Sequence, residues 1–439
     1  MKKYIISAII CCSMVDTPCF AQQPLASSPV NRRDSLEILE EQLKNYRSVD
    51  PSKLTEKEVS QEIIAGKSDI FLDVKYRNVE IKTWNQPKVK VITKVLIEGK
   101  SALTDEQWFE RLNLIVKVIG SRVQITSGVE NASYFNSYSS AVTTYISGNS
   151  YNNSSLTVFN GEGNRVGAIE TAKRTIIVFI PEGNKLEVEN QSGNLQLGNL
   201  HTVSIKSTNG SIETGDINKL ILRSKYTPVV VGNIKDAEIE IANGRLRAGN
   251  IENLDIDSKY TNVEIGTVNN IMLRSANDEY EIEDAGEIKG RKTYGNLRIT
   301  NLTTAIDFEG ANADIKVRNI SPAVETININ NKYADIRLPV NSIKNYEVRF
   351  SGRYNTVYAP FDKKPLNDTV KKDDPLADVT VIGRAGNGRI TNRSLNNLQS
   401  VVSFNDASDS RGFTAEAGDI KGKHTRFVIN CASCTVDFK

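Results

Sequence analysis

The chain has 439 residues, which is enough for two or three ordinary domains or for one array of repeats whose core grows by adding units. Its 55 Lys and Arg residues against 53 Asp and Glu leave a formal charge of +2, and the two signs are interspersed along the sequence. Because no basic stretch offers the footprint that a nucleic acid requires, we expect no nucleic-acid partner.

Residues 1–21 predict a secretory signal peptide. Lys2 and Lys3 precede a short apolar run, and a small-x-small cleavage site ends at Ala21. The run is too short to cross a bilayer, and no later segment reaches the roughly 20 apolar residues that a membrane-spanning helix needs. We therefore expect an exported protein without a transmembrane segment, located in the periplasm, at the outer membrane or on the cell surface.

The next two segments precede the repeats. Residues 22–66 predict a leader helix followed by a linker, because "DSLEILEEQLKNYR" has helical periodicity and a polar stretch follows it. Residues 67–130 predict a small α+β cap, in which strands flank a helix that starts at the capping box Thr104–Gln107. Unpaired strand edges promote aggregation, so a repeat array needs such a cap at its end.

Residues 131–170 are rich in Ser, Asn and Tyr and have little hydrophobic pattern, which predicts a long surface loop. Two interpretations of this loop remain open. Polar loops rich in tyrosine serve as recognition surfaces in many proteins, and the same composition is typical of disorder. The aromatic residues that would carry recognition are Tyr134, Phe135, Tyr138, Tyr145 and Tyr151.

The segment from residue 171 onward contains a 17-residue repeat. Glycine recurs at this spacing, at positions 198, 215, 232, 249 and 266. When the sequence is written in rows of that length, the apolar side chains align in columns, and within a row they alternate with polar ones, as in a strand with one buried face. Strands this short bury that face only by stacking on the next row. One of the columns consists of Val203, Leu220, Ala237, Leu254, Ile271 and Ile288.

This pattern predicts an all-β fold, a single-stranded parallel β-helix over residues 171–439 with about 17 residues in each coil. After one inserted residue near Ala305, and with longer corners from there on, we expect the same register to continue through Ile327 and Val348. A charged loop with two prolines at 362–375 interrupts the pattern, and the last strands are expected to close the array.

A column of tyrosines marks one corner of the predicted coils. Asn and Tyr alternate in it from Asn209 to Tyr294, so that "SKYT" coils neighbour "TNG" or "ANG" coils. At a corner the in-and-out alternation of a strand does not decide exposure. Two interpretations therefore remain, namely rings packed against the corner asparagines or an exposed binding stripe. The candidate binding residues are Tyr226, Tyr260, Tyr294, Tyr333 and Tyr354.

A second column lies on a strand face and is charged. Opposite charges in adjacent coils form either a salt-bridge ladder or a cluster of catalytic groups, and the short corners of 17-residue coils favour the ladder. Only His201 and His424 are present, so histidine-based catalysis and histidine-rich metal sites are not expected. We predict no catalytic residues, no metal site and no cofactor. The column consists of Lys206, Arg223, Glu240, Asp257, Arg274 and Arg291.

Cys431 and Cys434 are the only cysteines that remain after cleavage at Ala21. In a straight strand their Cα atoms would lie about 10 Å apart, so a disulfide between them requires a turn at Ala432–Ser433. A redox Cys-x-x-Cys opens a helix, whereas β-like sequence lies on both sides of this pair. The flanks therefore favour a structural role over redox chemistry.

Several segments carry a family resemblance, which covers roughly residues 67–439. The signal peptide, the strand-strand-helix-strand element, "VFIPEGNKLEVENQSGNLQLGNL", the "KYxxVxV" coils and "NNKYADIRLP" together resemble the "putative adhesin" family of exported bacterial β-helix proteins. These are relatives of the auto-transporter adhesin head domain. The resemblance implies a right-handed helix and an adhesin-like role outside the cytoplasm, and it supplies no catalytic residues.

These observations lead to one function and its alternatives. We expect a non-enzymatic, exported, adhesin-like protein whose extended surface binds glycans or proteins of the cell envelope. The alternative is a carbohydrate-active enzyme, a polysaccharide lyase or hydrolase, built on the same fold. A further option is an envelope-stress or signalling accessory that binds a partner through the N-terminal cap.

Overall fold

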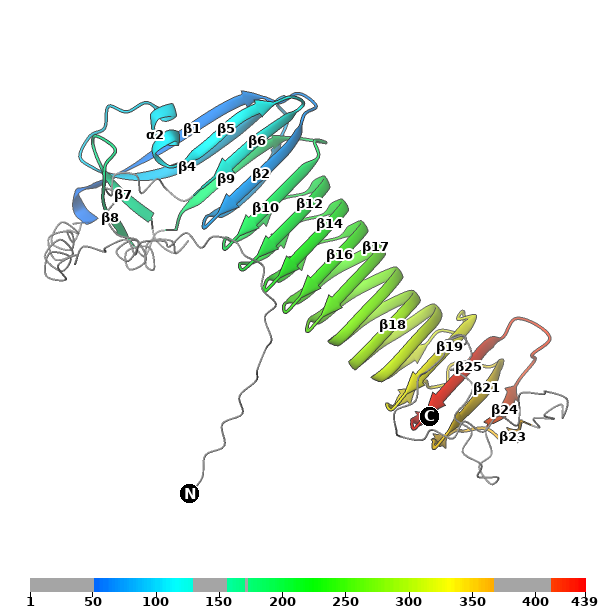
Figure 1. Cartoon of the computed structure of the whole chain (residues 1–439). Coiled ribbons are helices and arrows are strands. Elements are labelled where there is room, and N and C mark those ends of the chain that lie inside the picture. Colours follow the sequence, from blue (N-terminus) through cyan, green and yellow to red (C-terminus); the bar gives the residue numbers. More distant parts are fainter. Residues whose placement is uncertain (1–50, 129–155, 170–172, 367–411) are drawn as a thin grey trace, which may run out of the picture. The chain divides into compact units, whose positions relative to one another are not determined.

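The computed structural model describes residues 51–128, 156–169, 173–366 and 412–439. Apart from the short helices η1 (Pro51–Lys53) and α2 (Asp105–Arg111), the described elements are β-strands, which form a large, mixed and mostly parallel sheet (Figure 1). The predicted signal peptide and leader helix, the five candidate aromatic residues from Tyr134 to Tyr151 and most of the charged 362–375 loop lie outside the described residues.

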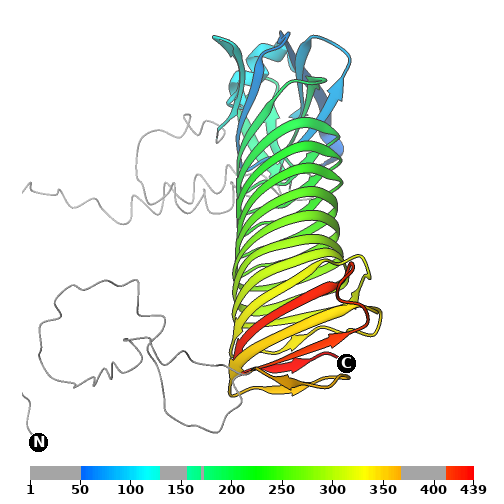
Figure 2. The ribbon, with the colours of Figure 1, turned by 90° about the vertical axis from the view of Figure 1, so that its right-hand side faces the viewer.

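The centre of the structure is a series of coils that pair in parallel at the spacing of the sequence repeat. Val203 pairs with Leu220 and Leu220 pairs with Ala237, as the repeat predicts. Figure 2 shows the coils lying one above the next. We call this series the stack. One side of it, the first wall, is built from strands β10 (Leu186–Gln191), β12 (Leu200–Thr208), β14 (Ile217–Lys225), β16 (Ile234–Ala242) and parts of β17 (Arg245–Lys259) and β18 (Asn262–Ile320).

The second wall has the same register. Ile212 pairs with Val229, and Val229 pairs with Leu246. Its strands are β11 (Leu195–Leu197), β13 (Ile212–Thr214), β15 (Pro228–Val231) and further parts of β17 and β18.

The core lies between the two walls, and the apolar columns predicted from the sequence are buried in it. Each coil contributes aliphatic side chains that contact those of the coils on either side, and burying one such side chain contributes roughly 1.5–3 kcal/mol. The columns are therefore both the repeat signal and the main stabilising element. The first-wall column is at most 7% exposed and consists of Val203, Leu220, Ala237, Leu254, Ile271 and Ile288.

The stack begins earlier than the sequence predicts. β2 (Asp69–Lys75) pairs in parallel with β10, and β3 (Asn78–Trp84) pairs with β11. Residues 69–84 are thus the first coil rather than part of a separate cap at 67–130. The partner of Leu72 is Val188, so a long insertion separates this coil from the next and removes the repeat signal.

The insertion and the preceding strand extend both walls at this end of the stack. β4 (Lys88–Glu98) pairs with β1 (Leu54–Ile64) and with β9 (Thr175–Pro181), and β9 in turn pairs with β3. The prediction of a linker up to residue 66 is therefore wrong for residues 54–64. On the first wall, β2 is followed by β6 (Arg122–Ser127) and β5 (Leu114–Ile119).

The helix α2 begins at the predicted capping box. The Thr104 N–H donates to the Gln107 side chain at 2.9 Å, and Gln107 N–H donates to the Thr104 hydroxyl. The helix packs against β1 and β5 and buries Trp108, which contacts Phe159 of β7 (Leu156–Asn160) edge to face. β7 and β8 (Arg165–Ile169) form an antiparallel hairpin, so the surface loop predicted for 131–170 does not extend over these strands.

At the other end the chain returns into the stack. β25 (Thr425–Ala432) pairs in parallel with both β19 (Thr326–Lys332) and β21 (Tyr346–Arg353), and Phe427 is the partner of Ile327 and of Val348 (Figure 1). Ile327 and Val348 therefore lie in one column, as the sequence predicts, but Phe427 of the inserted strand stands between them. On the second wall β26 (Thr435–Asp437) lies in the same way between β20 (Ile336–Arg337) and β22 (Thr356–Tyr358).

Two antiparallel strands cover the end of the first wall. β24 (Gly412–Ala417) pairs with β21, and β23 (Lys364–Pro365) pairs with β24. Aromatic side chains fill the space beneath them, with the rings of Phe350 and Phe413 stacked at 5.2 Å. The last strands close the stack, as expected, but by insertion and reversal rather than by a further coil.

Candidate functional site

Each coil passes from the first wall to the second through one residue with positive φ. At Tyr226, for example, φ is 54°, and the next corner, at Asn243, has the same value. We call this line of corner residues the tyrosine edge. In stacking order it consists of Tyr76, Ser192, Asn209, Tyr226, Asn243, Tyr260, Asn277, Tyr294, Asn312, Tyr333, Ser433 and Tyr354.

The backbone ladder continues through these corners. The N–H of Tyr226 donates to the carbonyl of Ala242 at 3.0 Å, and the N–H of Asn243 donates to the carbonyl of Lys259 at 2.9 Å. Each corner is therefore fixed by the next coil, which holds its residue in the left-handed conformation although only glycine and asparagine adopt it readily.

The "SKYT" sequence explains one kind of corner. Ser224 is buried inside the turn, and Thr227, also buried, closes the turn by donating its hydroxyl to the carbonyl of Lys225 at 2.8 Å. Lys225 and Tyr226 project outward between them. Thr261 makes the same hydrogen bond to the carbonyl of Lys259 at 3.0 Å.

The "ANG" corner is the complement of this arrangement. A Cβ atom added at Gly244 would lie 2.5 Å from the carbonyl oxygen of Thr227 in the preceding coil, so a side chain there would collide with the backbone. At this pair of coils the glycine thus follows the threonine corner for a steric reason, whereas the next threonine corner, Thr261, is followed by Asp278. This reason concerns the residue after the corner and leaves the identity of the corner residue itself unconstrained.

The five predicted binding tyrosines all lie on the tyrosine edge, and their rings are exposed. The exposed fractions are 60% for Tyr226, 62% for Tyr260, 52% for Tyr294, 64% for Tyr333 and 72% for Tyr354. This exposure favours the interpretation as an exposed stripe over rings packed against the corner asparagines. Tyr76, in the first coil, is half-buried.

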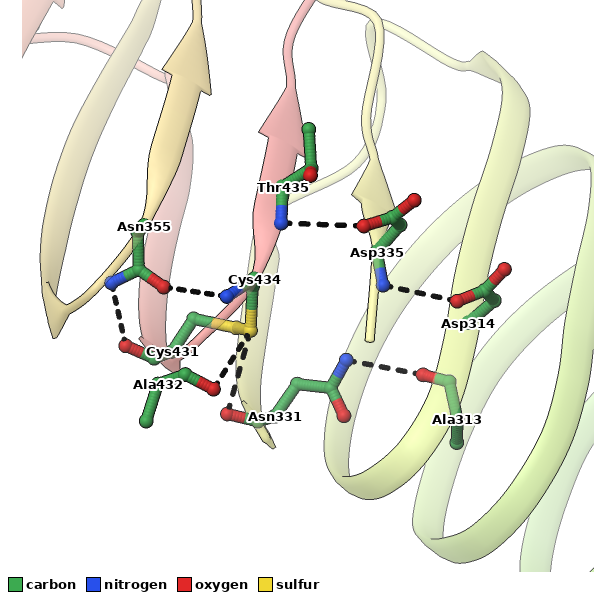
Figure 3. The surroundings of a disulfide bond; sticks show 9 residues. All are labelled: Ala313, Asp314, Asn331, Asp335, Asn355, Cys431, Ala432, Cys434 and Thr435. Atoms are coloured by element: carbon green, nitrogen blue, oxygen red, sulfur yellow. Dashed lines mark hydrogen bonds between the residues drawn. A yellow bond between two sulfur atoms is a disulfide. The ribbon is translucent and has the colours of Figure 1, made fainter. Parts of the chain in front are cut away.

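The inserted strand contributes a corner of its own, which holds the disulfide. Cys431 and Cys434 flank Ser433, whose φ is 58°, and this turn brings their Cα atoms to 6.1 Å (Figure 3). Asn355 of the neighbouring coil accepts from the N–H of Cys434 at 2.8 Å and donates to the carbonyl of Cys431 at 2.9 Å. Both cysteines are buried. The bond joins the residues on either side of the turn and so closes this corner.

Comparison with known protein families identifies the family to which this stack of coils belongs. The profile of the toastrack DUF4097 family matches residues 68–375, well over half of the chain. The chain belongs to the toastrack DUF4097 family. The matched segment starts just before β2 and ends before β24, so β24, β25 and β26 of this toastrack protein lie outside it.

Other comparisons add little to this assignment. The toastrack chain is similar to a solved structure from Clostridium sporogenes described as a "putative cell adhesion protein", at 10% identity and a TM-score of 0.17. That alignment covers 88% of this chain and 100% of the other. The comparison with curated proteins found no match.

The charged column of the toastrack coils forms the predicted ladder. Arg223 contacts Glu240 of the next coil at 3.3 Å and also Glu238, and Arg274 contacts Asp257 and Asp255. All of these side chains are between 41% and 55% exposed, so each pair contributes on the order of 0.5 kcal/mol.

A shallow hollow of about 330 Å³ lies beside this ladder, where Ala237 replaces a larger residue of the apolar column. Carboxylates line it, as the alternative enzymatic function requires, but each is engaged. Glu238 and Asp255 contact the arginines of the ladder, Glu287 contacts Lys289 at 2.6 Å, and Asp236 accepts from Asn253 at 2.9 Å. In the described part of the chain, no group of three His, Cys, Asp or Glu residues is placed to hold a metal ion.

Beneath the tyrosine edge, one corner encloses a buried polar cluster around Asp278. Its carboxylate accepts from the hydroxyls of Ser258 at 2.7 Å and Ser275 at 2.6 Å, and from the N–H of Thr261 at 2.7 Å. Lys292 Nζ donates to Ser275 Oγ at 3.0 Å and lies 5.2 Å from the centre of the Tyr280 ring.

Burial changes the titration of this cluster. Loss of hydration lowers the pKa of Lys292 from 10.5 to about 8, while the negative charges of Asp278 and Glu279 oppose the change. Burial also raises the pKa of the Tyr280 hydroxyl, which lies against the Ser258 hydroxyl. Because these groups face the interior, the cluster acts on stability and not on the exposed edge.

The described helices include none that is long and apolar enough to cross a membrane.

Proposed function

We propose that this toastrack protein is a non-enzymatic, exported, adhesin-like protein that attaches to envelope or surface molecules along the tyrosine edge. The observation that carries the proposal is the combination of conformation and exposure at the five tyrosines. A tyrosine in the left-handed region costs about 1–2 kcal/mol relative to an ordinary conformation, whereas asparagine tolerates it. Asparagine occupies the alternate corners, so the fold itself does not call for rings.

Strained conformations persist where a function requires the side chain. Exposed aromatic rings are also the side chains that contribute most to binding surfaces. A row of them that the fold does not require is best explained by recognition.

We further propose that the coils form a right-handed parallel β-helix, as in the proteins that the sequence resembles, and that the protein works outside the cytoplasm. The parallel pairing of like positions in successive coils supports the first point. The predicted signal peptide and the disulfide between Cys431 and Cys434 support the second, because such bonds persist in oxidising compartments.

The test compares the chain from Gln22 onward with a triple variant, Tyr226→Asn, Tyr260→Asn and Tyr294→Asn. Asparagine keeps the left-handed corner that the neighbouring coils already use, so the variant should fold and melt at the same temperature or slightly higher. Binding to immobilised cell-envelope fractions and to a glycan panel should fall about tenfold or more.

A matched control removes exposed apolar side chains elsewhere. Val230 and Met272 lie on the walls, 44% and 42% exposed, and the variant Val230→Thr, Met272→Gln should bind as the unchanged chain does. Equal binding by the folded triple-asparagine variant would contradict the proposal and return attention to the alternative functions.

A further inference from the structure

The rings of the tyrosine edge recur with a fixed period. Neighbouring coils lie about 4.8 Å apart, so tyrosines in alternate coils lie about 9.6 Å apart. The alternation runs unbroken from Tyr226 to Tyr354, because Ser433 of the inserted strand takes the asparagine position between Tyr333 and Tyr354. This period is close to the length of two sugar residues in an extended β-1,4-linked polysaccharide.

Positive charge follows the same period. Lys225, Lys259, Lys332 and Arg353 each precede a tyrosine of the edge, and Thr293 alone departs from the pattern. Their partners in neighbouring coils are small residues, since Lys259 lies between Ala242 and Ala276. The coils that carry asparagine or serine at the edge thus have no charged residue at this position, and they separate the cations of the tyrosine coils from one another.

These cations differ from those on the walls. Among the described residues, Lys225, Lys259 and Lys332 have no carboxylate within salt-bridge distance, although all three are exposed. Arg223 and Arg274, which lie on the first wall, each contact two carboxylates. The lysines beside the rings are therefore available to an anionic partner.

We propose that the tyrosine edge binds a linear, anionic, β-1,4-linked polysaccharide that runs along the stack. Alternate sugars stack on the tyrosine rings, and acidic groups of the polymer lie against Lys225, Lys259 and Lys332. The inference rests on the proposed function, because it names the ligand class of the same edge.

Two other polyanions fit the edge less well. A lipid surface would require apolar side chains that insert between headgroups, whereas the corners between the rings carry Asn209, Asn243, Asn277, Asn312 and Ser433. A single-stranded nucleic acid stacks successive bases on rings, at a closer spacing than every second coil provides.

The experiment measures binding of the chain from Gln22 onward to oligomers of β-1,4-linked mannuronate by calorimetry. Affinity should increase with oligomer length up to about eight sugars, the length that the span from Tyr226 to Tyr354 accommodates. It should also fall as salt is raised. The neutral β-1,4-linked mannan oligomers of equal length should bind about tenfold more weakly.

Two charge variants separate the edge from general attraction. Lys225→Gln, Lys259→Gln and Lys332→Gln together should lower affinity for the mannuronate oligomers about tenfold and leave binding of mannan unchanged. The control Lys185→Gln, Lys219→Gln and Lys235→Gln removes the same charge from exposed lysines away from the edge and should have little effect.

Each negative result would contradict a different part of the two proposals. If mannan oligomers bind as tightly as mannuronate, or if phosphatidylglycerol vesicles or single-stranded DNA bind more tightly and depend on the tyrosines, the polysaccharide inference is wrong while the tyrosine edge remains a binding surface. Mannuronate binding that is unchanged in both the triple-asparagine and the edge-lysine variants would also overturn it. If the triple-asparagine variant retains all binding to envelope fractions as well, the proposed function fails with it.

Discussion

At the scale of single residues, the tyrosine edge shows what a repeat pattern can and cannot predict. The recurring asparagine in the column already indicates a left-handed corner, because asparagine is enriched in that conformation. Exposure of the alternating tyrosines does not follow from that conformation alone, since Tyr76 has the same left-handed corner and is half-buried. Ser433 could not be placed in this column from sequence, because its coil lies far along the chain from its neighbours.

Lys292 leads to a prediction about pH at this scale. Its pKa is about 8 in the folded protein and 10.5 when exposed, so between these values the unfolded chain binds the additional proton and stability rises with pH. The free energy of unfolding of the native chain, relative to Lys292→Met, should increase by about 1–2 kcal/mol from pH 7 to 9.5. Urea titrations at both pH values measure this difference.

Staying below pH 10 keeps Tyr280 out of this measurement. Its raised pKa means that the unfolded chain alone would lose this proton above its usual value of 10, which would lower stability at higher pH. If the free energies of unfolding of the native and Lys292→Met chains changed with pH in the same way, Lys292 would have the same pKa in the folded and the unfolded state, and the prediction would be wrong.

At the scale of elements, the sequence predicts register wherever successive coils keep the spacing of the repeat. Leu254 pairs with Ile271 for this reason. β1 was missed because its sequence, "LTEKEVSQEII", is mostly polar and forms a strand only through pairing with the apolar β4. The insertion of β25 could not be predicted, because its partners, β19 and β21, lie far from it in the sequence, where no period remains.

The disulfide corner gives a prediction for one element. Because the bond closes only a short loop, replacing both cysteines in Cys431→Ser, Cys434→Ser should lower the free energy of unfolding by about 2 kcal/mol. Reduction of the native chain should produce a similar shift in the urea midpoint. A native midpoint that is unchanged when mass spectrometry shows both thiols free would contradict a stabilising role for this bond.

At the scale of the whole molecule, stability is local and the last strands matter most to the end they join. Each coil contacts only its neighbours, so damage at one end should not spread through the stack. Removing residues 412–439 leaves β19 and β21 with unpaired edges and takes Phe413, Phe427 and Phe438 from the core.

The truncated chain ending at residue 411 should therefore self-associate, because open strand edges pair with other copies. Light scattering should report oligomers, and hydrogen exchange should show lost protection over 326–358 with unchanged protection over 186–302. A monomeric truncated chain with native protection at 326–358 would show that β25 contributes nothing to this end.

The insertion of β25 also concerns the order in which the chain is synthesised and folds. β19 and β21 emerge first, and in a partly synthesised chain they are free to pair directly, in the register that the sequence alone suggests. Such a pairing must open again to admit β25, and closing long loops around non-local strands is slow. The stack therefore reaches its final state only after the C-terminal strands have been synthesised, so folding is completed after translation and not during it.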